Sequence, residues 1–361
     1  MLLAIRFSLD DVIEGSIKFN GERQYGLGVD VIRWFVASRD DQSKPELIPI
    51  TPQEIDQMNS EINMIRRSFR ELVMHLNHEF PKQYYIDLND LPFLHDFIYT
   101  NLILFIYNVT KAYDNYEISK VYRLIMDFVK SHICDIYLQG TKGFLISNPL
   151  DQESYTIVYM YGRICENLLL VLAPILCHNA QNMYEYLNRG KEKSIFHCKW
   201  PEISQKQIKK IIQRVPEYQA LVNLRNKISE ELVKNINRIE KDFQKISKEL
   251  ELVFLCDVNS EEWKLLNLMG NDGKNFFGVQ DVLFETFEEN KRRETLVIAS
   301  FNYVETRKDR KNLEFRIKVY GVKSAKCYRC LKNQSKKEGE LCKNCQEYLQ
   351  KHRLRLPELV L

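Results

Sequence analysis

Glycine and proline are scarce in this 361-residue chain, with 13 and 10 residues. Barrels and sandwiches built from many short strands need both residues at their tight turns, so the composition argues against these folds. No apolar run approaches the roughly 18 residues that cross a bilayer, and we expect no membrane partner. Basic and acidic side chains nearly balance, with a formal charge of only +3. Any nucleic-acid-binding surface must therefore be local, and we expect no DNA partner.

The chain also lacks the short motifs of common active sites. It has no Gly-x-x-x-x-Gly-Lys-Ser/Thr phosphate loop, no Gly-x-Gly-x-x-Gly fingerprint and no Gly-x-Ser-x-Gly elbow. The first residues, MLLAIRFSLDD, contain too short an apolar segment for a secretory signal. We therefore predict no catalytic residue. Five of the nine cysteines are scattered among apolar neighbours and are typical of reduced thiols: Cys134, Cys165, Cys177, Cys198 and Cys256.

Apolar residues at helical spacing dominate the chain from residue 51 to about residue 190. The segment 51–76 opens with Thr51-Pro52 and Glu54, a pattern typical of helix N-termini. The spacing predicts further helices at 92–113, 116–138, 154–176 and 177–188, with a loop at 139–152. Successive helices of this length indicate an α-helical bundle.

The pattern changes in the second half of the chain. Residues 202–248 are polar and heavily charged, which favours an exposed helix with ion pairs between successive turns. Three apolar runs then predict strands at 250–258, 294–304 and 313–322, with a helix at 263–275 between them. The predicted fold class is mainly α, a helical bundle followed by a small α+β unit and a C-terminal cysteine-containing module. We place the domain boundaries at 1–50, 51–201, 202–322 and 323–361.

Two Cys-x-x-Cys pairs, Cys327/Cys330 and Cys342/Cys345, stand eleven residues apart in the C-terminal module. Four thiolates at this spacing can surround one Zn²⁺ tetrahedrally, which predicts a closed structural site with four cysteine ligands. Four unliganded thiols, or disulfides, are the alternative. The module has few apolar residues, so a bound zinc would supply most of its stability.

Positive charge is concentrated in the same module. Between Gly321 and Leu361 the chain has ten Lys/Arg and four Asp/Glu, an excess larger than that of the whole chain. A compact basic tip suits a phosphate backbone, and ordinary surface lysines are the alternative reading.

These motifs, in this order, resemble the isoleucyl-tRNA synthetases of the bacterial and mitochondrial type. CYRCLKNQ and GELCKNCQEYL are similar to the C-terminal zinc module of that family, with Leu331 at the place of a tryptophan. VDVIRWFVAS (29–38) and DDVIEG (10–15) are similar to segments that follow the catalytic core. AYDNYEISKVYRLIMDF (112–128) and LLLVLAPILCHNAQNMYEYL (168–187) resemble the anticodon-binding helical domain. The resemblance covers nearly the whole chain and is weakest over 205–320.

The two ATP-binding signatures of the family, His-Ile-Gly-His and Lys-Met-Ser-Lys-Ser, are absent. The resemblance implies that the complete enzyme uses ATP to attach isoleucine to its tRNA. This chain would be the C-terminal portion, inactive alone, and residues 1–50 would be a remnant of the region that contacts the catalytic core. Four apolar residues of segment 29–38 then need another cover, or they form an exposed apolar patch: Ile32, Trp34, Phe35 and Val36. A separate catalytic chain would be one such partner.

The partner that the resemblance implies is an isoleucine-specific tRNA. The resemblance also implies that the protein is in the mitochondrial matrix, or otherwise in the cytoplasm. Readers of unpaired RNA stack bases on aromatic rings and anchor phosphates with basic side chains. The positions predicted to contact tRNA are Arg66, Arg67, Arg123, Lys130, Lys326, Tyr328, Arg329, Lys336, Lys343, Lys351 and Arg353.

Two other readings of the sequence stay open. The chain could be a stand-alone tRNA-binding protein descended from a synthetase, without a ligase role. It could also be an unrelated helical protein whose zinc ribbon docks a protein partner. Whether the chain is an enzyme is not decided by these patterns.

Overall fold

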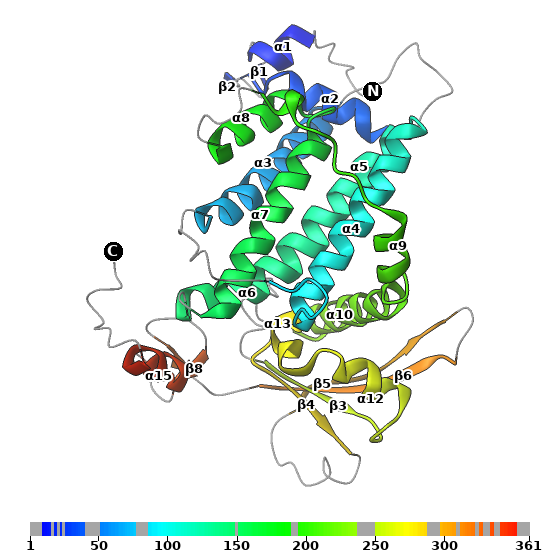
Figure 1. The fold of residues 1–361 in the computed structure, drawn as a ribbon, viewed down its shortest axis with the longest axis vertical. Helices are drawn as coiled ribbons and strands as arrows, with labels where there is room; N and C mark the ends of the chain where they lie inside the picture. Colours follow the sequence, from blue (N-terminus) through cyan, green and yellow to red (C-terminus); the bar gives the residue numbers. More distant parts are fainter. Residues whose placement is uncertain are drawn as a thin grey trace. The chain divides into compact units, whose positions relative to one another are not determined.

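The computed structural model describes residues 9–15, 18–19, 22–23, 26–39, 51–76, 86–148, 151–188, 194–236, 250–286, 297–307, 311–321, 325–327, 333–335 and 340–351. It is mainly helical, with a four-stranded sheet (Figure 1). Together with a C-terminal cysteine cluster, this is the fold class that the sequence predicts. Within these residues, no helix is both long and apolar enough to cross a bilayer.

The elements up to residue 236 are short pieces at the N-terminus followed by helices. They are α1 (Leu9–Glu14), β1 (Lys18–Phe19), β2 (Glu22–Arg23), α2 (Val29–Ser38), α3 (Pro52–Met74), α4 (Phe93–Asp114), α5 (Ile118–Asp127), the π-helix η1 (Phe128–Leu138), α6 (Gln139–Ser147), α7 (Gln152–Leu172), α8 (Cys177–Asn188), the 3₁₀-helix η2 (Ile195–His197), α9 (Gln205–Ile211) and α10 (Val215–Ile236).

The elements after residue 249 form the sheet and the C-terminal module. They are β3 (Leu250–Leu255), α12 (Glu261–Asn267), the 3₁₀-helix η3 (Gly270–Asp272), α13 (Gly273–Phe277), β4 (Asp281–Glu285), β5 (Val297–Glu305), β6 (Leu313–Gly321), β7 (Ala325–Lys326), β8 (Asn333–Ser335) and α15 (Lys343–Lys351).

The chain divides into two compact units. The first unit comprises residues 1–79, 101–132 and 158–208, and the second comprises 80–100, 133–157 and 209–361. Helices α4, η1, α7 and α9 therefore contribute residues to both.

Helix α3 of the first unit begins where the sequence predicts. The Thr51 hydroxyl accepts a hydrogen bond from the Glu54 amide, and the Glu54 carboxylate accepts one from the Thr51 amide, which completes a capping box. The backbone bond from Thr51 contributes most to holding the pKa of Glu54 below its usual value. The apolar side of α3 is buried at Ile55, Met58, Ile62, Ile65, Phe69, Leu72 and Val73.

Helix α2 packs against α3 and α5 within the first unit. Trp34 is fully buried, and its Nε1 donates to Glu61 Oε2 at 2.9 Å, where the Tyr122 hydroxyl also donates at 2.8 Å. Phe35 is buried as well, whereas Val36 is 55% exposed. The apolar segment 29–38 thus finds most of its cover inside the chain itself.

The predicted loop at 139–152 is wrong over most of its length, because residues 139–147 form α6 directly after η1. The two glycines of this segment suggest a turn, but Gly140 serves close packing. A Cβ at Gly140 would lie 2.9 Å from Leu94 Cδ2 and 3.2 Å from the Asn275 carbonyl oxygen. A side chain at Gly140 would therefore require the end of the Leu94 side chain to move and the Asn275 carbonyl to shift by a few tenths of an ångström.

The sheet of the second unit has the strand order β4-β3-β6-β5. β3 pairs with β4 in parallel, and the other neighbours are antiparallel. The strand β4 is missing from the sequence prediction, and the single helix predicted at 263–275 is broken into α12, η3 and α13, with Gly270 at φ +49°. Arg225 of α10 donates to the carbonyl oxygens of Phe276 and Asp135, at 2.9 and 2.6 Å, and its burial lowers its pKa.

Candidate metal centre and nucleic-acid interface

Three cysteines meet at the C-terminal module. Cys327 follows β7, Cys342 precedes α15, and Cys345 lies in the first turn of α15. All three are buried, and their sulfur atoms lie within 4.8 Å of one another. The backbone amide of Cys342 donates to Cys327 Sγ at 3.2 Å. The fourth predicted ligand, Cys330, lies outside the described residues. The two Cys-x-x-Cys arms are therefore brought together in space.

This arrangement fits a metal ion. Sulfur atoms around a tetrahedral zinc lie about 3.8 Å apart, given Zn–S bonds of about 2.3 Å. The start of a helix and an amide that donates to sulfur both favour the thiolate form, which is the form that binds metal. Leu341 packs on the cluster, and Tyr348 and Leu349 on α15 are buried too. Among the cysteines that the structure describes, none forms a disulfide.

The predicted tRNA-contacting residues of this module fall partly within the described residues. Lys343 and Lys351 are exposed on α15, where Lys343 Nζ lies 3.8 Å from Glu347 Oε1 and Lys351 Nζ lies 3.5 Å from Asp151 Oδ1. Such exposed pairs are weak and leave the lysines available to another anion. The remaining positions lie outside the described residues, or in one case have no described side chain: Tyr328, Arg329, Lys336, Arg353 and Lys326.

The four predicted contacts on the helices all lie in the first unit and are all exposed. Arg66 and Arg67 are neighbours on α3, while Arg123 lies on α5 and Lys130 on the η1 helix that continues it. The structure thus places them on two different helices. They are accessible to a ligand, and their contact with tRNA stays a prediction.

Helix α9 carries basic residues that the sequence analysis overlooked. A capping box starts it, since the Gln207 amide donates to Ser204 Oγ at 3.3 Å and the Ser204 amide donates to Gln207 Oε1 at 3.0 Å. Ile208 and Ile211 are buried, which turns Lys206, Lys209 and Lys210 outward, and all three are exposed.

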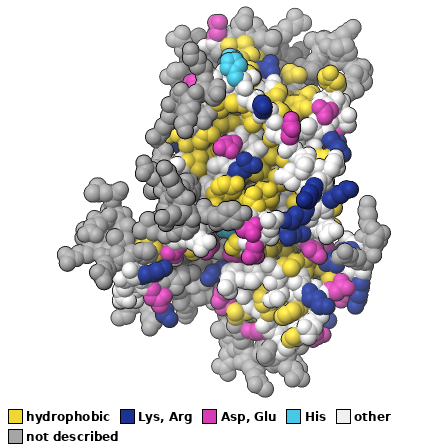
Figure 2. Space-filling model, viewed as in Figure 1, with side chains coloured by type: hydrophobic (Ala, Val, Ile, Leu, Met, Phe, Trp, Pro, Cys, Tyr) yellow, Lys and Arg dark blue, Asp and Glu magenta, His cyan; other side chains and the backbone are white. Residues whose placement is uncertain are grey.

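Figure 2 shows Lys and Arg side chains gathered where Figure 1 draws α9 and the start of α10. Lys210 donates to Asn89 Oδ1, and within the described residues no carboxylate pairs with Lys206 or Lys209. The sequence contained one signal for this helix. Ile208 and Ile211 are three residues apart, a spacing that could have identified α9 as a short helix of its own within the charged helix predicted at 202–248.

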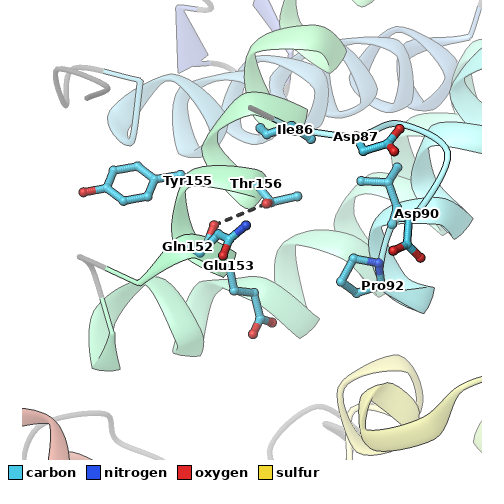
Figure 3. A pocket seen from close by; sticks show the side chains of 9 residues that line it. Ile86, Asp87, Asp90, Pro92, Gln152, Glu153, Tyr155 and Thr156 are labelled. Atoms are coloured by element: carbon cyan, nitrogen blue, oxygen red, sulfur yellow. Dashed lines mark hydrogen bonds between the residues drawn. The ribbon is translucent and has the colours of Figure 1, made fainter. Parts of the chain in front are cut away.

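A pocket of about 510 Å³ lies within the second unit, and its lining is acidic. Figure 3 shows the loop that precedes α4, with Asp87 and Asp90, facing the first turn of α7, with Gln152, Glu153 and Thr156. Three carboxylates at one opening repel phosphate, so the pocket is unsuited to an RNA backbone. The basic residues of α9 and of the tip are better suited to that role.

Comparison with known proteins supports the resemblance given by the motifs. Residues 96–253 match the sequence model of a family described as the anticodon-binding domain of tRNA ligase. The chain is 26% identical over 356 residues to an isoleucine–tRNA ligase of Prochlorococcus marinus strain MIT 9301, a match that covers 94% of this chain and 34% of the relative. It is 24% identical over 329 residues to the isoleucine–tRNA ligase of Natranaerobius thermophilus, covering 90% and 33%.

These matches confirm the resemblance to isoleucyl-tRNA synthetases. They run along nearly the whole chain, which itself spans about a third of the length of the curated relatives.

Proposed function

Because the chain resembles isoleucine–tRNA ligases along nearly all of its length, we propose that it provides the tRNA-binding part of such an enzyme and recognises the anticodon region of an isoleucine tRNA. The observation that carries the proposal is the match of residues 96–253 to the anticodon-binding domain, since this range runs from α4 to β3.

Recognition would follow the physics of unpaired RNA. The bases of an anticodon loop are open to stacking and to hydrogen bonds, while the phosphates attract lysine and arginine. The basic face of α9 and the exposed lysines of α15 supply phosphate contacts, and Tyr328 is the stacking candidate. Arg66, Arg67, Arg123 and Lys130 are the candidates on the other helices.

The cysteine cluster would hold one Zn²⁺ through Cys327, Cys330, Cys342 and Cys345. A closed site of this type is structural, because no coordination position is left for a reacting water. The four residues tie the segment after β7 to the start of α15 and so fix the direction in which the basic tip points.

The chain alone would not activate isoleucine. The 361 residues contain neither of the two signatures with which the family binds ATP. Isoleucine-dependent exchange of pyrophosphate into ATP should be undetectable with this chain, and a measurable exchange rate would contradict the proposal.

Binding to tRNA tests the proposal directly. Affinity for an isoleucine tRNA and for the same tRNA with a swapped anticodon should be measured at one fixed salt concentration, because phosphate contacts make affinity salt-dependent. We expect the native anticodon to bind at least about 10-fold more tightly, the cost of losing one well-recognised base. Equal affinities would count against anticodon recognition and leave a non-specific RNA-binding or protein-docking module.

The role of α9 can be tested with Lys206→Ala/Lys209→Ala. Removing two phosphate contacts should weaken binding to both tRNAs equally and lower the slope of log affinity against log salt by about 1.5 to 2. The matched control is Lys264→Ala, an exposed lysine on α12. If the double variant and the control bind alike, α9 is not part of the interface.

A further inference from the structure

A second group of metal-binding side chains lies in the first unit, far along the chain from the C-terminal cysteines. Asp30 stands at the start of α2, and Cys177 and His178 are the first two residues of α8. One ligand atom from each of the three lies within 4.8 Å of the others. Asp30 is 3% exposed, Cys177 is half-buried and His178 is exposed.

The Asp30 carboxylate is already held in position on one side. Its Oδ2 accepts hydrogen bonds from the Asn179 backbone amide at 2.7 Å and from Asn179 Nδ2 at 2.8 Å. Leu176, which precedes α8, has no side chain that could cap the helix, so Asp30 caps it from α2. Oδ1 accepts a hydrogen bond from the Cys177 thiol at 3.7 Å, so a cation bound here would replace the thiol proton between sulfur and oxygen.

We propose that Asp30 Oδ1, Cys177 Sγ and a ring nitrogen of His178 form a binding site for a borderline divalent cation, of which Zn²⁺ is the best match. Oxygen, sulfur and nitrogen ligands are the set that zinc takes, and three protein ligands with one open position are a known arrangement for it. Bonds of about 2.0 Å to oxygen and 2.3 Å to sulfur at a tetrahedral angle put those atoms about 3.5 Å apart. The observed 3.7 Å is close to this value.

The charges at the site favour a divalent cation. A carboxylate and a thiolate together neutralise Zn²⁺, and the two hydrogen bonds from Asn179 orient the carboxylate as outer-shell partners do in metal sites. The start of α8 is a positive helix end, which opposes a cation but favours the thiolate that would bind it. Arg33 is the nearby positive side chain on α2, and its guanidinium is engaged with the carbonyl oxygens of Ile175 and Pro174 at 2.7 and 2.8 Å.

A metal at this place would fasten α2 to α8. The two helices already pack together, and the site would join residues that are separated by almost 150 positions in the chain. The exposed ring of His178 gives the ion a route from solvent. The expected result is a chain that binds one metal ion more than the C-terminal cysteines account for.

The decisive experiment compares the zinc content of the full chain with that of Cys177→Pro after loading with Zn²⁺ and desalting. Cys177 is the first residue of α8, where proline is well tolerated because the amide has no partner inside the helix. We expect this variant to bind one zinc fewer per chain than the native protein. The control is Cys198→Ser, a half-buried thiol of the same unit, and it should lose none.

Two milder variants guard against effects on folding. His178→Ala changes an exposed side chain, and Asp30→Asn keeps an oxygen that can cap α8 while removing the charge. Each should weaken binding of Zn²⁺, and of Co²⁺ followed by its thiolate absorption band, at least about 10-fold with an unchanged circular dichroism spectrum. The same zinc content in the native chain, Cys177→Pro and His178→Ala would overturn the proposal. The readout is the difference in zinc content between the native chain and Cys177→Pro. It therefore does not depend on tRNA binding or on the zinc of the C-terminal cluster.

Discussion

Helix α3 and the C-terminal module differ in the residue types that they bury. Along α3, seven apolar side chains from Ile55 to Val73 are at most 5% exposed, and the helix starts with its own capping box. In the described part of the C-terminal module, the buried side chains are three cysteines, Tyr348 and Leu349. The helix is stabilised by burial of apolar surface, whereas the module would be stabilised by the metal ion that its cysteines bind.

This difference makes the two regions sensitive to different perturbations. Apolar burial contributes about 25 cal/mol per Å² and acts wherever side chains pack, so losing one side chain weakens a helix without abolishing it. A metal site acts through a single ion, and its binding free energy is folding free energy. One substitution among these cysteines should therefore remove the whole contribution from the module and leave the helices nearly intact.

The largest expected effect comes from Cys342→Ser. Losing one thiolate should release zinc from the tip and remove about 10 kcal/mol of metal-binding free energy, by comparison with small zinc modules. Hydrogen exchange should then rise across residues 340–351 and stay unchanged in α3. Cys198→Ser serves as the control. If α3 loses protection together with the module, the two regions are not independent and the comparison fails.

A core substitution should give the opposite pattern. Ile65 on α3 is fully buried, so Ile65→Ala should lower the free energy of unfolding of the helices by about 2–5 kcal/mol through lost burial and a cavity. The zinc held by the C-terminal cysteines, measured in the Cys177→Pro background that lacks the second site, should not change. Denaturant unfolding followed by circular dichroism gives the loss, with the exposed Arg66→Ala as a control that should stay within about 0.5 kcal/mol. A loss of zinc in Ile65→Ala would show coupling between the regions.

Acid should lower the free energy of unfolding through protonation of His95 on α4. Burial lowers the pKa of His95 from 6.5 to about 4, and its Nδ1 lies 2.9 Å from the Tyr137 hydroxyl. Between those pH values the unfolded chain binds a proton that the folded chain does not, so stability rises with pH across this window and is lost as pH falls from about 6.5 to about 4. The full difference is about 3 kcal/mol.

Comparing unfolding of the native chain and His95→Asn at pH 4.5 and pH 7 isolates this group. The variant should be less sensitive to acid, while metal release from the tip, which follows protonation of thiolates, should keep the same pH dependence. An identical loss of stability in both proteins would show that His95 is not the group responsible.

The smallest effect is expected at the start of α3. Thr51→Ala removes the hydroxyl that accepts from the Glu54 amide at 3.3 Å, and should cost about 1 kcal/mol. Thr51→Ser keeps an acceptor and should be nearly neutral. Denaturant midpoints of the two variants give the comparison, and equal midpoints would mean that the cap contributes nothing to the fold.

Local signals in the sequence were sufficient for α3 and for the cysteine arms. Thr51, Pro52 and Glu54 predicted the start of α3, and its apolar spacing predicted the buried face, because both depend only on neighbours along the chain. The two Cys-x-x-Cys pairs likewise predicted that Cys327, Cys342 and Cys345 meet.

What sequence reasoning missed depends on tertiary contacts. Residues 139–152 were predicted as a loop, yet Gly140 lies inside α6, where it packs closely against Leu94 and Asn275. The short strand β4 gains its place by pairing with β3, and its five residues carry little pattern of their own. The meeting of Asp30 with Cys177 and His178 joins positions almost 150 residues apart, and no spacing rule could have indicated it.

The cap that Asp30 provides for α8 has a consequence for folding during synthesis. Synthesis runs from the N-terminus, so α2 leaves the exit tunnel long before α8 is made. We therefore expect the acceptor for the Asn179 amide to be present before the first turn of α8 forms. In a chain translated from a start codon after residue 30, α8 would lack the Asp30 cap, and we expect its first turn to fray.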